Sequence, residues 1–428
     1  MLEVVGASLV GLLINILGQG PVKLEAIPLV SWQEAAIFRA SVEPDAKLEA
    51  IVEQYLEGLS ALGMASKAQS IWIQSDWTEL ANYQGTVPVS AASLTKIATT
   101  LAALDKWGVN HRFETSVYAT GSVKDGVLQG DLAIQGSGDP LFVWEEAIAV
   151  GNRLHQLGIR QVTGNLVVVG NFSINYKSNP AVAGQLLKQG LDARLWPPAA
   201  LQSHAALPPG TPRPQVAIAG TVLVQPTLPE AARLLLRHQS LPLAEIIKQM
   251  NIYSNNEIAQ MLADSVGGAE TVAQLAAKKA NVPPAEIQLV NGSGLGVDNR
   301  ISPRAVCAML RVLERELASQ SLKVADLFPL AGRDRLGTMK RRSIPAGITV
   351  KTGTLNQVSA LAGVIPTQER GPVWFAIINH GNKIEQFRAE QDRLLQRLSQ
   401  HWQLMPVTAT IPGKAYLGDP RRNLQVGS

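Results

Sequence analysis

The C-terminal part of the chain carries the pattern that most restricts its fold. Three short apolar segments with tight connections follow one another at residues 348–352, 358–365 and 373–378. The turn at 368–371 between the last two is so short that we expect them to pair antiparallel. Helical spacing of apolar residues then runs over 384–402. These features predict an antiparallel sheet covered by a C-terminal helix.

The rest of the chain divides into helical flanks around a strand-rich middle. Helical spacing appears at 44–63 and 93–107, and Gly108 follows the second of these segments in the usual place of a helix C-terminus. From about residue 114, short alternating apolar runs are separated by Gly, Asp and Ser, which is typical of strands. Helical spacing returns at about 243–262.

We therefore predict an α+β fold in which an inserted domain interrupts the main domain. The main domain, a sheet flanked by helices, is expected at 32–113 and 178–402, with a small, mainly-β inserted domain at 114–177. Residues 403–428 contain Pro, Gly and charges without periodicity, which predicts a flexible tail.

An apolar stretch near the N-terminus, Val4–Leu17, predicts that residues 1–31 are an export signal or membrane anchor. It is short for a membrane span but suits the core of a signal peptide. Glu3 precedes it, and no Lys or Arg occurs before Lys23, so the flank is not typical. An ordinary buried helix and a misassigned start codon remain alternatives.

Composition excludes several other classes of protein. Hydrophobic residues make up 46% of the 428 residues and charged residues 17%, as in globular proteins with a large core. The net charge of +4 contains no long Lys/Arg run, which argues against a nucleic-acid partner. The single cysteine, Cys307, lies in an apolar helical pattern and is expected to be buried, so no disulfide framework exists. The six histidines lack metal-ligand spacing, and we predict no metal.

Three short motifs carry residue types suited to acyl transfer. In the first, Ser93-Leu94-Thr95-Lys96, the serine and lysine share one helix face, so the lysine could act as the base for a serine nucleophile. The serine also falls at a helix N-terminus, where backbone N–H groups favour negative charge. A capping serine beside a solvated lysine would give the same pattern.

The second motif is Ser254-Asn255-Asn256. The hydroxyl could relay a proton, and the amide of Asn256 could both donate to and accept from a peptide substrate. A helix cap is the simpler interpretation of these residues taken alone. Tyr253-Ser254-Asn255 also permits a competing Tyr-x-Asn register.

The third motif, Lys351-Thr352-Gly353 followed by Thr354, ends an apolar strand. A cation with two hydroxyls can hold a substrate carboxylate, and the glycine lets an acyl chain approach the strand closely. Thr354 offers a backbone N–H for an oxyanion. A strand that ends in a plain Thr-Gly turn is the alternative.

The three motifs occur in the order found in penicillin-binding proteins and related β-lactamases. The chain resembles the D-alanyl-D-alanine carboxypeptidase/endopeptidase family, the class C low-molecular-mass penicillin-binding proteins, over roughly residues 70 to 390. The similar stretches are residues 88–100, 130–140, 240–247, 291–295 and 330–354. Residues 172–216 depart from the family's usual sequence, and Asn255 stands where Asp is common.

The resemblance implies a serine β-lactamase/transpeptidase-like fold and a role for each motif residue. Ser93 would be the acylated nucleophile and Lys96 its base, while Ser254 and Asn256 would serve proton relay and amide contact. The residues that recognise the substrate carboxylate would be Lys351, Thr352 and Thr354. The backbone N–H groups of Ser93 and Thr354 would form the oxyanion hole.

The function implied is that of a serine-type D-alanyl-D-alanine carboxypeptidase/endopeptidase, which trims or un-crosslinks peptidoglycan stem peptides through a Ser93 acyl-enzyme. No cofactor is needed, β-lactams would trap the same serine, and the protein would work in the bacterial periplasm. Two alternatives are a β-lactamase or esterase on the same fold, and a non-catalytic wall-binding protein. The complete set of three motifs argues against the latter.

Overall fold

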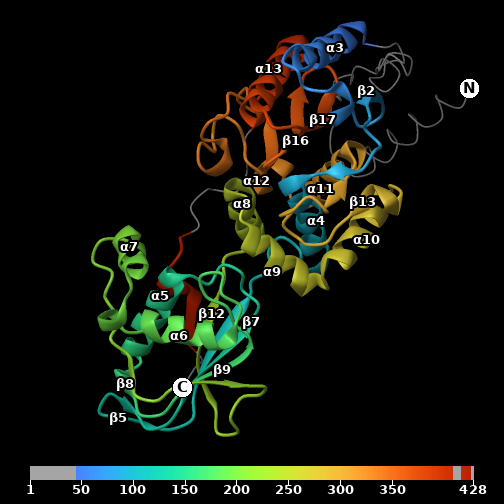
Figure 1. Cartoon of the computed structure of the whole chain (residues 1–428). Coiled ribbons are helices and arrows are strands. Elements are labelled where there is room, and N and C mark those ends of the chain that lie inside the picture. Colours follow the sequence, from blue (N-terminus) through green and yellow to red (C-terminus); the bar gives the residue numbers. More distant parts are fainter. Residues whose placement is uncertain (1–44, 408–415, 426–428) are drawn as a thin grey trace, which may run out of the picture. The chain divides into compact units, whose positions relative to one another are not determined.

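The computed structural model describes residues 45–407 and 416–425. Its main domain is built on a five-stranded antiparallel sheet with the order β15-β16-β17-β1-β2 (Figure 1). The strands are β1 (Gln69–Gln74), β2 (Glu79–Tyr83), β15 (Thr349–Leu355), β16 (Val358–Thr367) and β17 (Gly371–His380). The predicted C-terminal hairpin is present, with Thr367 opposite Gly371 at its turn.

Two helices from opposite ends of the domain cover one face of this sheet. They are α3 (Ala46–Ala61) and α13 (Ile384–Trp402), which also contact each other. Alternate strand residues such as Ile71 and Ile73 join their apolar side chains in one buried cluster. The side chain of Asp45 caps α3 by accepting a hydrogen bond from Leu48 N at 3.0 Å.

A helical group covers the opposite face and contains the first two sequence motifs. It consists of α4 (Thr95–Trp107), α8 (Leu243–Tyr253), α9 (Asn256–Val266), α10 (Ala269–Ala280) and α11 (Pro303–Ala318). Trp72, whose strand neighbours point the other way, packs into this core. Cys307 on α11 is fully buried in the same core, as predicted.

Short elements complete this domain around the first motif. A three-stranded sheet joins β3 (Val89–Ser90), β13 (Ile287–Gln288) and β14 (Arg300–Ile301), and α12 (Val324–Leu327) packs on α8. Since β3 leads directly into the Ser93 turn, this small sheet fixes the start of that turn.

The inserted domain contains two sheets and three helices around its own apolar core. Its six-stranded sheet is mixed, with the order β11-β9-β7-β4-β12-β18, and a four-stranded sheet has the order β10-β8-β6-β5. The elements are β4 (Glu114–Ala119), β5 (Val123–Lys124), β6 (Val127–Leu128), β7 (Leu132–Ser137), α5 (Trp144–Gln156), β8 (Gln161–Val162), β9 (Leu166–Asn171), α6 (Pro180–Gly190), α7 (Pro198–Ala206), β10 (Ala217–Ile218), β11 (Val222–Gln225), β12 (Arg233–Gln239) and β18 (Asn423–Gln425).

The predicted boundary of the insertion at residue 177 is too early. Residues 178–239 supply α6, α7 and β10–β12, whose strands hydrogen-bond into the two sheets of the inserted domain. Leu187 and Val216 belong to its buried core. Helix α7 lies in a Pro-rich stretch, residues 197–214, that has no helical spacing of apolar residues. Pro198 occupies the first turn of this helix, which buries only Ala200, so sequence analysis did not predict it.

The C-terminal tail is also not uniformly irregular, contrary to the prediction for 403–428. Residues 423–425 form β18, which pairs antiparallel with β12 in the register His238 opposite Asn423. A strand of three residues is too short to give a periodic pattern. The predicted signal or anchor at 1–31, and residues 32–44 of the predicted main domain, lie outside the described residues.

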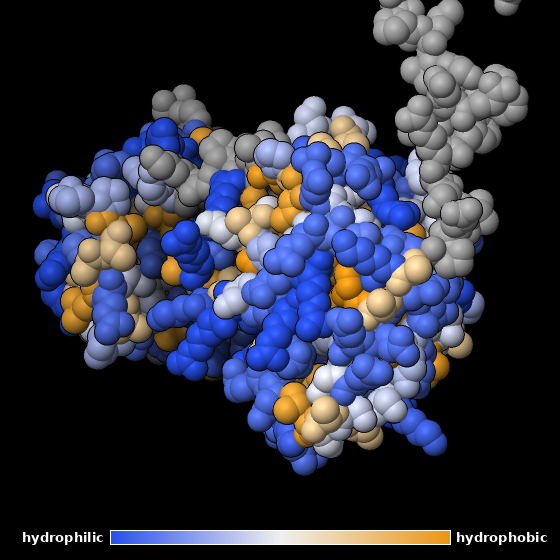
Figure 2. All heavy atoms as spheres, turned by 90° about the horizontal axis from the view of Figure 1, so that it is seen from above, coloured by the Kyte–Doolittle hydropathy of each residue, from blue (hydrophilic) through white to orange (hydrophobic). Residues whose placement is uncertain are grey.

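The surface is largely polar on the face drawn in Figure 2. Hydrophilic residues cover most of it, and apolar residues gather there in separate patches. Among the helices of residues 45–407 and 416–425, none combines the length and the hydropathy that a membrane crossing requires.

The revised boundary can be tested by unfolding. We expect Leu187→Ala to lower the free energy of unfolding of the inserted domain by about 2–5 kcal/mol, because the side chain is 1% exposed in that core. Leu201→Ala on α7, where the side chain is 44% exposed, should change it by less than about 0.5 kcal/mol. Urea unfolding followed by circular dichroism measures both, and equal effects would argue against the assignment.

Candidate active site

Ser93 lies in a tight turn between the small sheet and a helix. A short 3-10 turn, Ala92–Leu94, carries it directly into α4. Ala92 has φ of +47°, which is unusual for a residue with a side chain and lifts the serine out of the strand direction. Gly294 packs behind this turn, where a Cβ would come 1.9 Å from Ala92 O. The turn is therefore held from behind by backbone contact.

Lys96, one helical turn after Ser93, is completely buried. Its Nζ donates hydrogen bonds to Ser93 Oγ at 3.0 Å, Asn256 Oδ1 at 2.8 Å and the Ser293 carbonyl at 2.6 Å. Burial lowers the pKa of Lys96 to about 7, although the charge of Glu257 opposes this. A substantial fraction of Lys96 is therefore neutral near neutral pH.

The three partners of Lys96 leave only one place for its lone pair when the amine is neutral. The Ser293 carbonyl and Asn256 Oδ1 can only accept, so they use two N–H groups of the amine. Only the Ser93 hydroxyl can reverse its role and donate. The contacts thus orient the basic lone pair toward the serine proton.

The second motif joins α8 to α9 beside the two lysines. Ser254 ends α8 in the left-handed region, with φ of +53°, and its Oγ accepts from Lys351 Nζ at 2.9 Å. Asn255 caps α9 by accepting from Ile258 N, whereas Tyr253 is 52% exposed. Because Ser254 and Asn256 make the contacts to the lysines, the geometry favours the Ser-x-Asn register over the Tyr-x-Asn register.

The third motif lies on β15, at the edge of the main sheet next to the Ser93 turn. Lys351 is buried, and its Nζ also donates to the Thr352 carbonyl at 2.7 Å. Burial, reinforced by nearby Lys96, lowers the pKa of Lys351 well below its ordinary value. Thr352 Oγ1 is buried without a hydrogen-bond partner among the described residues. The edge thus combines a buried lysine amine with an unsatisfied hydroxyl.

Gly353 and Thr354 occupy different environments on the same strand. A Cβ at Gly353 would lie 3.0 Å from Ala91 O and 3.1 Å from the Ala92 side chain, so the glycine allows β15 to approach the Ser93 turn. This packing is a different reason for glycine from the substrate clearance that we predicted. Thr354 is exposed, and its Oγ1 accepts from Arg388 Nη2 at 2.9 Å.

Two contributions to the site were missed from the sequence. The Ser293 carbonyl binds Lys96, and the Asn291 side chain holds that loop by accepting from Ser293 N and Gly294 N at 3.1 and 2.8 Å. The Asn-Gly-Ser-Gly turn was recognised as family-like but received no role. Arg388 on α13 gave no signal, because a charged residue on a surface helix is ordinary.

The described part of the chain contains no group of three or more His, Cys, Asp or Glu side chains placed to hold a metal ion.

Comparison with known proteins decides the family. The sequence matches the D-Ala-D-Ala carboxypeptidase 3 (S13) family over residues 48–175 and 213–401, well over half of the chain. The chain belongs to this family. It is accordingly a serine-type D-Ala-D-Ala carboxypeptidase, which confirms the resemblance inferred from the motifs. The gap in the match at 176–212 lies within the stretch that departs from the family's usual sequence.

Individual relatives of this S13 carboxypeptidase are distant. The D-alanyl-D-alanine carboxypeptidase DacB of Haemophilus influenzae is 24% identical over 68% of this chain and 80% of its own length. A carboxypeptidase of Mycobacterium tuberculosis is 25% identical over 83% of this chain and 81% of its own length.

Solved structures confirm the fold of the S13 carboxypeptidase. A penicillin G-acylated predatory endopeptidase from Bdellovibrio bacteriovorus superposes with a TM-score of 0.70 at 22% identity, covering 83% of this chain and 99% of that one. Penicillin-binding protein 4 from Haemophilus influenzae gives 0.61 at 18% identity, with 81% and 98% coverage. The predicted α+β transpeptidase-like class is thus confirmed.

The low pKa of Lys96 makes a prediction about pH dependence. Only the neutral amine can accept a proton, so kcat/KM for release of D-alanine should rise with pH, pass a midpoint near 7 and then level off. Glu257→Gln should move this midpoint to lower pH, because the Glu257 carboxylate favours the charged lysine and raises its pKa. The exposed Glu270→Gln on α10 is the matched control. A midpoint that stayed fixed or rose in Glu257→Gln would contradict the electrostatic account.

Proposed function

We propose that this S13 carboxypeptidase cleaves D-alanyl-D-alanine ends of peptidoglycan stem peptides through an acyl-enzyme on Ser93. The observation that carries the proposal is the contact of the buried Lys96 amine with both Ser93 Oγ and Asn256 Oδ1. A neutral amine can take the Ser93 proton while Oγ attacks the carbonyl of the penultimate D-alanine. Backbone N–H groups of Ser93 and Thr354 then stabilise the oxyanion.

Proton transfer to the leaving group completes acylation. Ser254 lies beside Lys351, since its Oγ accepts from Lys351 Nζ. We assign it the relay that delivers a proton to the amine of the departing D-alanine as the C–N bond breaks. Water then attacks the ester, Ser93 regains its proton, and the shortened peptide leaves. Asn256 contacts the substrate amide through the donor group that Lys96 leaves free.

Recognition of the substrate carboxylate falls to β15. Burial and the nearby charge of Lys96 disfavour the charged form of Lys351, so an arriving carboxylate offsets these effects and stabilises the charged form of Lys351. Thr352 Oγ1 supplies a donor that is otherwise unsatisfied. Thr354 Oγ1 accepts a hydrogen bond from Arg388, and this residue lies near the exposed end of β15.

Partners and compartment follow from this chemistry. Peptidoglycan stem peptides lie outside the cytoplasm, so we infer that the enzyme acts there, in the periplasm, with the N-terminal apolar stretch as export signal or anchor. β-Lactams present a strained amide and a carboxylate to the same groups, and we expect them to acylate Ser93. A β-lactamase on this fold would differ in rapid hydrolysis of the resulting ester.

Intact mass after incubation with benzylpenicillin tests the proposal. We expect a stable covalent adduct on the wild type and on Ser90→Ala, and none on Ser93→Ala. Ser90 is the matched control, because it is a buried serine on β3 whose Oγ has no hydrogen-bond partner among the described residues. The wild type should also release D-alanine from pentapeptide muropeptides.

Other outcomes would point elsewhere. Unmodified enzyme with hydrolysed drug would identify a β-lactamase. Unmodified enzyme with intact drug and intact muropeptides would indicate a wall-binding protein, and an adduct that persists in Ser93→Ala would place the nucleophile at another residue.

A further inference from the structure

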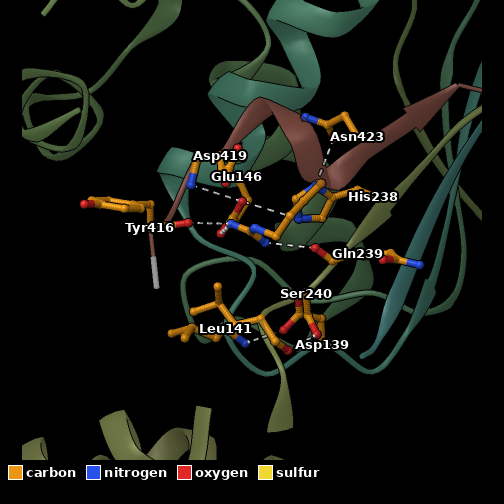
Figure 3. Close-up of polar contacts among 12 residues, drawn as sticks. Asp139, Leu141, Glu146, His238, Gln239, Ser240, Tyr416, Asp419 and Asn423 are labelled. Atoms are coloured by element: carbon orange, nitrogen blue, oxygen red, sulfur yellow. Dashed lines mark hydrogen bonds and ion pairs between the residues drawn. The ribbon is translucent and has the colours of Figure 1, made fainter. Parts of the chain in front are cut away.

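A buried ion pair fastens the C-terminal segment to the inserted domain. Glu146 lies in the first turn of α5 and is 1% exposed. Its Oε1 accepts from Arg422 Nη2, and its Oε2 accepts from Gly418 N at 3.2 Å (Figure 3). Arg422 and Gly418 both belong to residues 416–425, which we call the C-terminal latch. A buried carboxylate therefore depends on the latch for its partners.

The other groups around Glu146 do not replace Arg422. His238 Nε2 is 3.4 Å from Glu146 Oε2, but burial and the charge of Arg422 lower the pKa of His238 to about 3, so it is neutral. Burial raises the pKa of Glu146 to about 7, the charge of Arg422 opposes this shift, and the nearby charge of Asp139 adds to it. Arg422 is thus the countercharge in this cluster, and its removal would leave an unpaired buried carboxylate.

Further contacts fix the position of the latch. Arg422 Nη1 donates to Gln239 O at 2.9 Å, and β18 extends the sheet beside β12. Asn423 Oδ1 lies 2.9 Å from His238 Nδ1. At Gly418, where φ is +70°, a Cβ would come 2.9 Å from Glu145 O, so the backbones are in close contact. These contacts fix the latch in one position on the inserted domain.

In this position the latch borders a cavity beside the second motif. Leu417, directly before Gly418, lines a cavity of about 510 Å³ together with Tyr176, Leu241, Tyr253, Asn255 and Ile258. Tyr253 and Asn255 flank Ser254, which contacts Lys351. The latch lies beyond residue 401, where the family match ends. One wall of a cavity next to the catalytic motifs is thus supplied by the far end of the chain.

We propose that the C-terminal latch is a specificity element, and that the Arg422–Glu146 pair holds Leu417 as a wall for the part of the stem peptide that precedes the D-alanyl pair. This inference rests on the function proposed above. For a substrate with its carboxylate at Lys351 and its scissile carbonyl at Ser93, we place the remainder of the peptide on the side of the second motif. The cavity beside Asn255, lined by leucines, phenols and amides, suits that continuation.

The test compares a long and a short substrate. Arg422→Met should lower kcat/KM for a pentapeptide stem about tenfold, through a rise in KM, because displacement of Leu417 removes apolar contact with the substrate. Acylation by benzylpenicillin, whose phenylacetamido side chain is much shorter than the stem peptide before the D-alanyl pair, should change less than about twofold. Leu417→Ala should act in the same direction.

Two controls separate the latch from general damage. Arg421→Met is the matched change one residue away, where the arginine side chain is 83% exposed and pairs with Asp419. It should leave both reactions unchanged. The double variant Glu146→Met/Arg422→Met removes both charges and should recover the pentapeptide activity, because an apolar pair needs no countercharge.

The outcomes distinguish this proposal from the one on which it rests. Equal loss of pentapeptide and penicillin reactivity in Arg422→Met, or no loss of either, would overturn the latch proposal. If the double variant did not recover the pentapeptide activity, the ion pair would be excluded as the interaction that holds the latch in place. A wild-type enzyme that reacted with neither compound would instead refute the proposed function.

Discussion

The catalytic architecture depends on an amine that is held in the protein interior without a carboxylate partner. Lys96 is satisfied by a hydroxyl, an amide oxygen and a backbone carbonyl, none of which carries charge. An ion pair would have kept the lysine protonated and useless as a base. Each neutral contact comes from a different element, so the 92–94 turn, α9 and the 291–295 loop must all be in place around α4 before Lys96 can act as the base that we propose.

In the proposed mechanism, the second buried lysine, Lys351, couples binding of the substrate carboxylate to the electrostatics of the site. Lys351 is disfavoured as a cation by burial and by Lys96, and the carboxylate that we propose to bind at β15 would offset both effects by pairing with the ammonium. The free energy of the site is therefore least favourable without substrate. Such a loss of stability is common at sites where function and stability compete. The positive φ values of Ala92 and Ser254, on the two turns that present the hydroxyls, belong to the same pattern of local strain.

Sequence reasoning found the fold class and the three motifs, because each motif lies at the end of a strongly periodic segment. It could not find the Ser293 carbonyl, since every residue has one and only the fold brings this one to Lys96. It divided the chain too early at 177, because β10 and β11 are short, partly exposed strands whose partners lie far along the chain. It missed the latch for a similar reason, as β18 has three residues and one neighbouring strand.

The order of strands in the main sheet has a consequence for how the protein is made. β1 pairs with β17 in a register that places Gln69 opposite Asn379, so the sheet cannot close until nearly all of the chain has been synthesised. The inserted domain, between residues 114 and 239, can collapse around its own core much earlier. Such long-range pairing makes folding slow. Strand β1 can pair with β2 early, but its other edge remains without β17 until most of the chain has been synthesised, and an exposed strand edge of this kind favours chaperone binding or aggregation.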